Sequence, residues 1–243
     1  MRQTIVQPAA FLLAAFFLAG VLVAPALLAQ ETVFHRDSSV FAVVTHKAGV
    51  AAKLAHNHLV VATDYTLDGN FDPAEPTATR LTLDASVQGL VVDDAAQHQA
   101  WQDRIIALEI LGEPFGELKD SDRKKIRKSM LSKGQLNVEK HPRLSAEIVG
   151  ITDSGSGDFP YRVRLKVDIV GQSVETELTG RVESSAGGHV LEAYGELKFT
   201  DFGIKPYSAM LGAVRNDDPF HLFVHLVFRP TAEAEAPDST PRP

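Results

Sequence analysis

The sequence contains no cysteine in its 243 residues. The chain therefore forms no disulfide, has no thiol nucleophile, and has no N-terminal cysteine to receive a lipid. A hydrophobic core or a bound ligand must hold its fold together. Hydrophobic residues make up 44% of the chain, which is enough to build one sizeable core.

The sequence also lacks the short motifs of common enzyme classes. It has no Gly-x-Ser-x-Gly elbow, no His-Glu-x-x-His, no phosphate-binding loop and no dinucleotide fingerprint. The Asp-Phe-Gly triplet at 201–203 occurs in kinases, but no glycine-rich or catalytic loop accompanies it. The carboxylate pairs at 93–94 and 217–218 lie in turn-like contexts, which is typical of loop residues. We therefore predict a protein that is not an enzyme and needs no cofactor.

An excess of positive charge is absent as well. The formal net charge is -7, and without Arg2 it is -8, because one positive charge is lost. An acidic chain of this kind is a poor partner for nucleic acid, so we expect none.

Only one apolar run is long enough to cross a membrane, and it lies at the N-terminus. Arg2 is followed by a nearly continuous apolar stretch over 9–29, and the next charged residue is Glu31. The stretch ends in small residues around Ala29, which is the pattern of a cleaved signal peptide over 1–29. The alternative is an uncleaved membrane anchor, since about 20 apolar residues can span a bilayer.

Period-2 alternation is the strongest pattern in the rest of the chain. In 161–170, for example, Leu165 and Val167 share one face and Lys166 takes the other, as in a half-buried antiparallel strand. Eight such strands are predicted at 39–46, 58–67, 80–87, 144–152, 161–170, 173–183, 189–200 and 220–228. Eight strands with short turns favour a mainly β fold, an eight-stranded antiparallel barrel with no exposed sheet edge.

Two details of the strands lead to further expectations. The two residues at 171–172 fit a type II′ hairpin, because glycine comes first. The last strand, 220–228, is apolar on both faces, so its outer face needs cover from a helix or from a partner chain in a homodimer.

Two helices interrupt the β pattern. One is predicted at 95–111, and the other begins at Asp120 or Ser121 as N-cap and ends at Leu131. Ile126 and Met130 form the inner face of the second helix, and five Lys and Arg side chains at 123–128 form its polar side. That side is either an ordinary solvated face or a transient contact with anionic lipid headgroups at a membrane surface.

The histidines offer a candidate metal site. His56 and His58 lie two residues apart at a strand start, so both are expected on one face, and His46 ends the preceding strand. A zinc site on His46, His56 and His58 is one interpretation. The other is a hydrogen-bonded pair at a barrel mouth, with no metal bound.

Several segments, in order, resemble the YceI-like family. They are 37–41, then the Ala-Gly at 48–49 leading to 56–58, the helix end at 129–131, the segment at 141–147, the segment at 200–206 and the closing strand at 220–228. The resemblance implies a lipocalin-like barrel of eight strands plus helices, exported to the periplasm, that binds polyisoprenoid-type lipids. The segment at 231–243 has no apolar periodicity and is predicted to be a disordered tail, so with the signal peptide at 1–29 the barrel domain occupies 30–230.

The leading functional hypothesis is therefore an exported carrier for a long apolar lipid held in the barrel lumen. The predicted ligand-binding residues are Phe41, Val43, His56, His58, Leu165, Val167, Leu197, Phe199, Phe202, Tyr207, Leu222 and Val224. We expect His56 and His58 at the barrel mouth near Asp201, Phe202 and Tyr207, where they hold a polar headgroup. The alternatives are a periplasmic metal-binding protein using His46, His56 and His58, and an interaction protein whose barrel is fully packed.

Overall fold

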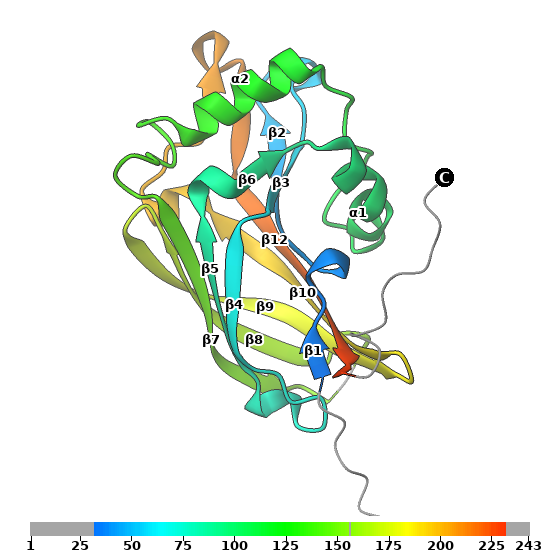
Figure 1. The fold of residues 1–243 in the computed structure, drawn as a ribbon. Coiled ribbons are helices and arrows are strands. Elements are labelled where there is room, and N and C mark those ends of the chain that lie inside the picture. The colour runs from blue at the N-terminus through cyan, green and yellow to red at the C-terminus, as the bar shows by residue number, and fades with distance from the viewer. Residues whose placement is uncertain (1–31, 156, 232–243) are drawn as a thin grey trace, which may run out of the picture. The chain divides into compact units, whose positions relative to one another are not determined.

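A computed structural model describes residues 32–155 and 157–231 (Figure 1). In these residues, twelve strands form one antiparallel sheet, and two α-helices pack against it. The long strands are β2 (Val40–Ala48), β3 (His58–Ala62), β4 (Tyr65–Asn70), β5 (Arg80–Ser86), β7 (Arg143–Asp153), β8 (Tyr161–Ile169), β9 (Gln172–Ser185), β10 (Gly188–Lys198) and β12 (Val214–Pro230). The short strands are β1 (Thr32–Phe34), β6 (Leu90–Val92) and β11 (Ser208–Ala209).

The sheet curls round on itself. Its strand order is β4-β5-β7-β8-β9-β10-β12-β2-β3-β6, and β1 and β11 both pair with β12. The strands at the two ends of this order, β4 and β6, are continuations in the chain of β3 and β5. The mainly β antiparallel fold with two helices is thus confirmed.

The count of eight strands is corrected to ten along the order of the sheet. All eight predicted strands are present. The strand predicted at 58–67 bends and counts twice, and the strand predicted at 80–87 continues past its predicted end, through a bend, into β6. The first bends between Ala62 and Tyr65, and the second bends through a short 3₁₀ helix, η4 (Val87–Gly89). At each bend a strand leaves one neighbour and begins to pair with another.

The hairpin between β8 and β9 also differs from the prediction. Ile169 pairs with Gln172, so the two loop residues are Val170 and Gly171. Both have positive φ, 47° and 77°, which is the pattern of a type I′ turn rather than type II′. In the prediction the loop lies one residue later in the chain. Each β8 residue would then pair with the β9 residue two positions further along than the one observed. That shift keeps every side chain on the same face, so alternation alone does not distinguish the two registers.

Helix α1 (Ala95–Ala107) covers the outer face of the last strand. Phe223 of β12 is fully buried there, and its ring centroid lies 5.8 Å from that of Trp101 of the helix. Ile105 of the helix joins the same cluster with Val44 of β2. Cover for the apolar outer face of β12 therefore comes from a helix of the same chain.

Helix α2 (Asp120–Leu131) lies across one end of the curled sheet, at the top of Figure 1. Its N-cap is Lys119, which makes no side-chain cap hydrogen bond, so the expectation of Asp120 or Ser121 was wrong by one or two residues. Arg123 and Arg127 are not simply solvated, because they donate hydrogen bonds to backbone carbonyls of Asp93, Leu90 and Gln88. These bonds fasten the helix over the end of the sheet.

Aromatic rings pack together at the opposite end, near β1 and the end of β12. Phe71 stacks on Phe228 at a centroid distance of 4.3 Å, and Phe34 lies 5.7 Å from Phe228 on its other side. Phe71 and Phe228 belong to the main hydrophobic core. This aromatic plug closes the end of the sheet away from α2.

The predicted signal peptide at 1–29, with its alternative as an anchor, lies outside the described residues. The predicted tail at 231–243 also lies outside them, apart from Thr231. No helix among residues 32–155 and 157–231 is long and apolar enough to cross a membrane.

Candidate functional site

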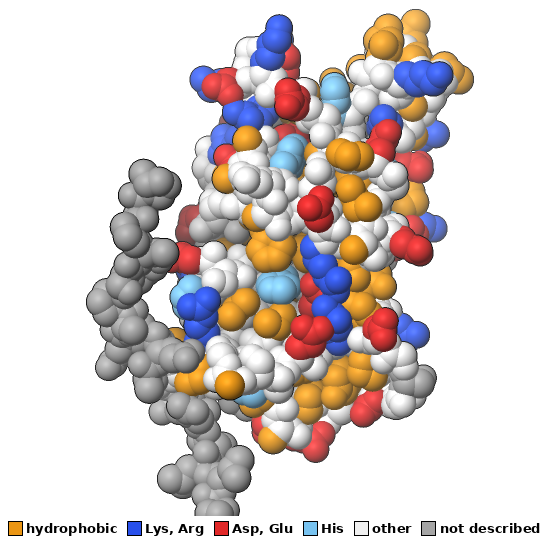
Figure 2. Space-filling view, turned by 90° about the vertical axis from the view of Figure 1, so that its right-hand side faces the viewer, with side chains coloured by type: hydrophobic (Ala, Val, Ile, Leu, Met, Phe, Trp, Pro, Cys, Tyr) orange, Lys and Arg blue, Asp and Glu red, His pale blue; other side chains and the backbone are white. Residues whose placement is uncertain are grey.

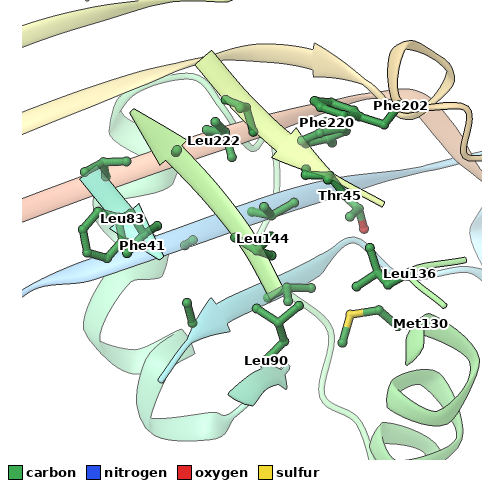
Figure 3. Close-up of a pocket in the computed structure, with 18 of the residues that line it drawn as sticks. Phe41, Thr45, Leu83, Leu90, Met130, Leu136, Leu144, Phe202, Phe220 and Leu222 are labelled. Carbon is green, nitrogen blue, oxygen red and sulfur yellow. The ribbon is translucent and has the colours of Figure 1, made fainter. Parts of the chain in front are cut away.

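The inward-facing side chains of the curled sheet enclose a cavity of about 350 Å³ (Figure 3). Alternate residues of each strand point into it, such as Phe41 and Val43 of β2 and Leu222 and Val224 of β12. Ile126 and Met130 of α2 and Leu136 of the following loop close over one end. The protein is therefore hollow rather than fully packed.

The wall of the cavity is almost entirely aliphatic and aromatic. Leu83, Leu90, Leu144 and Phe220 belong to it and come from four different strands. A cavity with this lining favours an apolar ligand, because the apolar part of its wall offers water no hydrogen-bond partner.

The polar residues of the wall gather at the end under α2. They are Thr45, His58, Lys125, Ser129, Gln135, Ser145, Tyr207 and Asn216. Thr45 of β2 pairs with His58 of β3, and Asn216 lies at the matching end of β12, where its N–H donates to the carbonyl of Tyr207 at 2.9 Å. Gln135 donates to the carbonyl of Lys205 at 3.0 Å, which links the loop after α2 to the segment before Tyr207. We call this end of the cavity the mouth.

Thr45 is an unusual member of the mouth. Thr45 is only 6% exposed, and among the described residues its hydroxyl oxygen has no hydrogen-bond partner. A buried hydroxyl without a partner destabilises a protein by about 1–3 kcal/mol. A ligand with a polar group at the mouth would supply the missing bond.

His58 is held at the mouth by Asp93. His58 Nδ1 lies 2.7 Å from Asp93 Oδ2, and the other carboxylate oxygen accepts the N–H of Leu59 at 2.9 Å and lies 3.3 Å from His98 Nε2. Burial alone would raise the pKa of Asp93, but the hydrogen bonds from His58 and His98 outweigh it and lower the pKa to about 2. The carboxylate is therefore ionised and can only accept, so His58 Nδ1 is the donor. Nε2 of His58 is then the ring nitrogen that Asp93 does not contact.

The prediction that both residues at 93–94 belong to an ordinary loop was incomplete. Asp94 caps helix α1 by accepting from Ala96 and Gln97, as a turn residue does. Asp93 is buried, with an exposed fraction of 2%, and orients a histidine of the cavity wall. A sequence motif cannot identify it, because its partners lie 35 residues before and 5 residues after it.

Ten of the twelve residues predicted to bind ligand line the cavity. They are Phe41, Val43, His58, Leu165, Val167, Phe199, Phe202, Tyr207, Leu222 and Val224. Phe199 reaches it from a 3₁₀ helix, η5 (Phe199–Phe202), rather than from a strand, because β10 ends at Lys198. His58, Phe202 and Tyr207 share this one cavity, as expected, whereas Asp201 is exposed beside it.

The other two predicted residues lie elsewhere. Leu197 is buried in the main core but does not reach the cavity wall. His56 precedes β3 and is exposed, and its ring lies against Gly116 of the loop after α1. It therefore does not share a face with His58, because the strand that would impose the alternation begins only at His58.

The three histidines of the candidate zinc site are not brought together. His46 Nε2 lies 2.9 Å from His221 Nδ1, His58 is bound to Asp93, and His56 lies against Gly116. Within the described ranges, no three His, Cys, Asp or Glu side chains are placed to hold a metal ion.

Helix α2 is the part of the site that the sequence indicated least. The spacing of Ile126 and Met130 does predict an inner face, and both residues line the cavity. Nothing in the pattern says that this face covers the cavity rather than the outside of the sheet.

A family model described as a YceI-like domain matches residues 38–228. Among solved structures, BcnA of Burkholderia cenocepacia is 13% identical with a TM-score of 0.56, and the match covers 80% of this chain and 99% of that one. The YceI protein of Campylobacter jejuni is 12% identical with a TM-score of 0.45, covering 69% of this chain and 83% of that one. No curated protein sequence matches the chain.

Proposed function

This chain belongs to the YceI-like family, a β-barrel fold that binds hydrophobic ligands, and we propose that it is an exported carrier of a long, polyisoprenoid-type lipid. The observation that carries the proposal is the cavity inside the sheet, with an apolar wall and polar residues gathered at one end. The lipid tail lies in the apolar part, and its polar group lies at the mouth.

The energetics favour a long chain. Burying one five-carbon isoprene unit contributes about 4 kcal/mol, at roughly 0.8 kcal/mol per carbon. Association itself costs about 4–15 kcal/mol. Several units must therefore enter the cavity before binding is useful, so long polyprenyl lipids bind more tightly than short ones.

The polar group of the ligand meets two side chains of complementary character. The hydroxyl of Thr45 is both donor and acceptor, and Nε2 is the ring nitrogen of His58 that Asp93 does not contact. A hydroxyl or a similar small group that both donates and accepts suits this pair. His58 binds the polar group in this proposal and has no catalytic role, in keeping with a family of binding proteins.

Export to the periplasm is part of the same proposal. It rests on the pattern over 1–29, where Arg2, an apolar stretch and small residues precede Gln30. N-terminal sequencing of exported protein should find a start near Gln30. Retention of Met1 would favour a membrane anchor instead.

The test of lipid binding uses protein purified from its own host. We expect organic extraction to release a long-chain lipid at close to one molecule per chain, identified by mass spectrometry. Metals are measured on the same sample, so that stoichiometric zinc without lipid would support the metal-binding alternative. Purified protein that holds no lipid, and does not take up added polyprenols, would refute the proposal.

A further inference from the structure

Two short loops stand next to each other beside the mouth of the cavity. One contains η2 (Ala52–Leu54), and the other joins β11 to β12 through η6 (Met210–Gly212). The N–H of Ala51 donates to the carbonyl of Ala213 at 2.9 Å, which holds the two loops together. Gly49 permits this approach, since a Cβ there would lie 2.4 Å from the same carbonyl oxygen.

These loops carry large apolar side chains that point into water. Val50 is 98% exposed, Leu211 is fully exposed, and Leu54 and Met210 are about two-thirds exposed. We call these four residues the apolar tips. Among the described residues, the only other exposed large hydrophobic side chains are Tyr207, at the mouth itself, and Val33, on β1 near the aromatic plug. Exposed hydrophobic side chains are thus concentrated on one projection, which forms the upper right of Figure 2.

The backbone of the second loop is also strained. Met210 and Leu211 have φ of 51° and 55°, in the left-handed region that favours glycine. The two strained residues gain little side-chain burial in the folded chain to offset the strain. Clustered exposed apolar side chains of this kind mark an interaction site.

The position of the tips ties them to the cavity. Tyr207 and Asn216, at the base of the second loop, line the mouth and are joined by a hydrogen bond. Helix α2 lines the mouth on another side. A surface that touches the tips and α2 at once would therefore lie over the opening of the cavity.

Basic side chains lie beside the tips and on the helix at the mouth. Lys53, Lys205 and Arg215 are exposed beside the two loops, and Lys124 and Lys128 are exposed on the outer face of α2. None of the five makes an ion pair with another described residue, whereas most other exposed charges on α2 are paired, such as Lys125 with Asp122. This local positive charge stands out on a chain whose formal net charge is -7.

We propose that the apolar tips insert into an anionic phospholipid bilayer while these basic side chains contact its headgroups, so that the mouth opens at the membrane surface. Apolar side chains among lysine and arginine are the arrangement that binds such an interface. This inference rests on the proposed function only in that docking would serve the transfer of lipid. Docking itself needs no lipid in the cavity.

Vesicle flotation tests the docking. The parent should float with vesicles of phosphatidylglycerol and phosphatidylethanolamine, and remain below with phosphatidylcholine alone. The variant Met210→Ser, Leu211→Ser should partition at least tenfold more weakly, because the side chains that enter the apolar phase are gone. Val33→Ser removes an exposed apolar side chain on β1 and is the matched control, with parental flotation expected.

A second pair of variants tests the charges. Lys124→Glu with Lys128→Glu should weaken flotation about fivefold for each positive charge removed, and the loss should shrink in high salt. Arg164→Glu with Lys166→Glu makes the same charge change on the outer face of β8 and should leave flotation unchanged. Equal losses in both pairs would reduce the effect to net charge and overturn the proposal.

Two measurements separate the other outcomes. Lipid extracted from each variant reports the cavity, so parental lipid content without vesicle binding would refute docking and leave the proposed function standing. Sedimentation in the absence of vesicles reports self-association. A parental dimer that becomes a monomer in Met210→Ser, Leu211→Ser would show that a second copy covers the tips, and would overturn the membrane proposal.

Discussion

Arg104 of α1 donates hydrogen bonds to the carboxylate of Glu192 of β10 through Nε and Nη2. Its Nε lies 2.9 Å from Oε2 and 3.1 Å from Oε1. Glu192 is fully buried, and Arg181 and His225 also contact its carboxylate, at 3.3 Å and 3.2 Å. One carboxylate thus links helix α1 to three strands of the sheet, β9, β10 and β12. Burial alone would raise its pKa, but hydrogen bonds from His225 and Arg104 lower it to about 2.

Replacing that carboxylate should weaken the fold. Glu192→Gln leaves three cationic or polar partners facing a neutral amide, and we expect the free energy of unfolding to fall by about 3 kcal/mol. Urea unfolding followed by circular dichroism measures the change. Glu177→Gln removes a carboxylate from an exposed pair with Arg162 at 3.9 Å, and it should cost less than about 1 kcal/mol. Equal costs would show that the buried network does not stabilise the fold.

Acid should destabilise the protein in a defined range. Asp93 and Glu192 have pKa values of about 2 in the folded chain, against ordinary values of 3.8 and 4.5. Their stabilisation is therefore present above about pH 4.5 and is lost as pH falls toward 2, by about 2–3 kcal/mol for each group. Thermal melts between pH 2 and pH 6 should show this loss. The double variant Asp93→Asn, Glu192→Gln should have a flatter profile, and an unchanged slope would contradict the assignment.

A second acid-sensitive range belongs to His46 and His221. Burial lowers the pKa of both rings below 6.5, and for His46 the neighbouring His221 adds to the effect. The unfolded chain then binds protons that the folded chain does not, so stability falls as pH drops below about 6.5. The variant His46→Asn, His221→Asn should lose less stability between pH 7 and pH 5 than the parent. His56→Asn, at an exposed position, is the control and should follow the parent.

A charge on the cavity wall should abolish lipid binding. Leu165 points into the cavity, so Leu165→Asp places a carboxylate where only apolar groups surround it, and should also lower stability by about 2–4 kcal/mol. Lys166→Asp makes a similar change on the outer face of the same strand and should retain lipid. Ala146→Phe fills the cavity without adding charge, so it distinguishes loss of space from loss of fold. Full lipid content in folded Ala146→Phe would place the ligand elsewhere.

Removing the hydroxyl of Thr45 should raise stability but weaken ligand binding. Thr45→Val keeps the shape of the side chain and removes the unpartnered hydroxyl, so the ligand-free protein should gain about 1 kcal/mol. Binding of a polyprenol should weaken about fivefold, because a net hydrogen bond is worth about 1 kcal/mol. Binding of the matching hydrocarbon should not change. Equal effects on both ligands would remove Thr45 from headgroup recognition.

Alternation was enough to predict eight of the strands and which side chains of each share a face, but not which face lines the cavity. Phe41, Leu165 and Leu222 lie far apart in the chain, yet each line of inward residues follows from period 2 within its own strand. The bends at Ala62 and Val87 do not follow from it, because they arise where a strand changes neighbours, which is a property of the closed sheet.

The chemistry of the mouth was harder to predict than its walls. His58 was identified at the mouth, but its orienting partner Asp93 was not, since a buried carboxylate and a loop carboxylate look alike in sequence. His56 was placed beside His58 by a spacing that holds only inside a strand, and β3 begins two residues after His56. Contacts between distant elements decided both cases.

The aromatic plug of Phe34, Phe71 and Phe228 packs at the end of the sheet opposite the mouth, which leaves the mouth as the route for a lipid. A lipid must then enter tail first and leave headgroup first, so loading and unloading occur in opposite order through the same opening. A tail longer than the cavity would push its polar group out past Thr45 and His58, and the contacts proposed there would be lost. The protein would therefore favour a tail that fills the cavity while its polar group stays at the mouth.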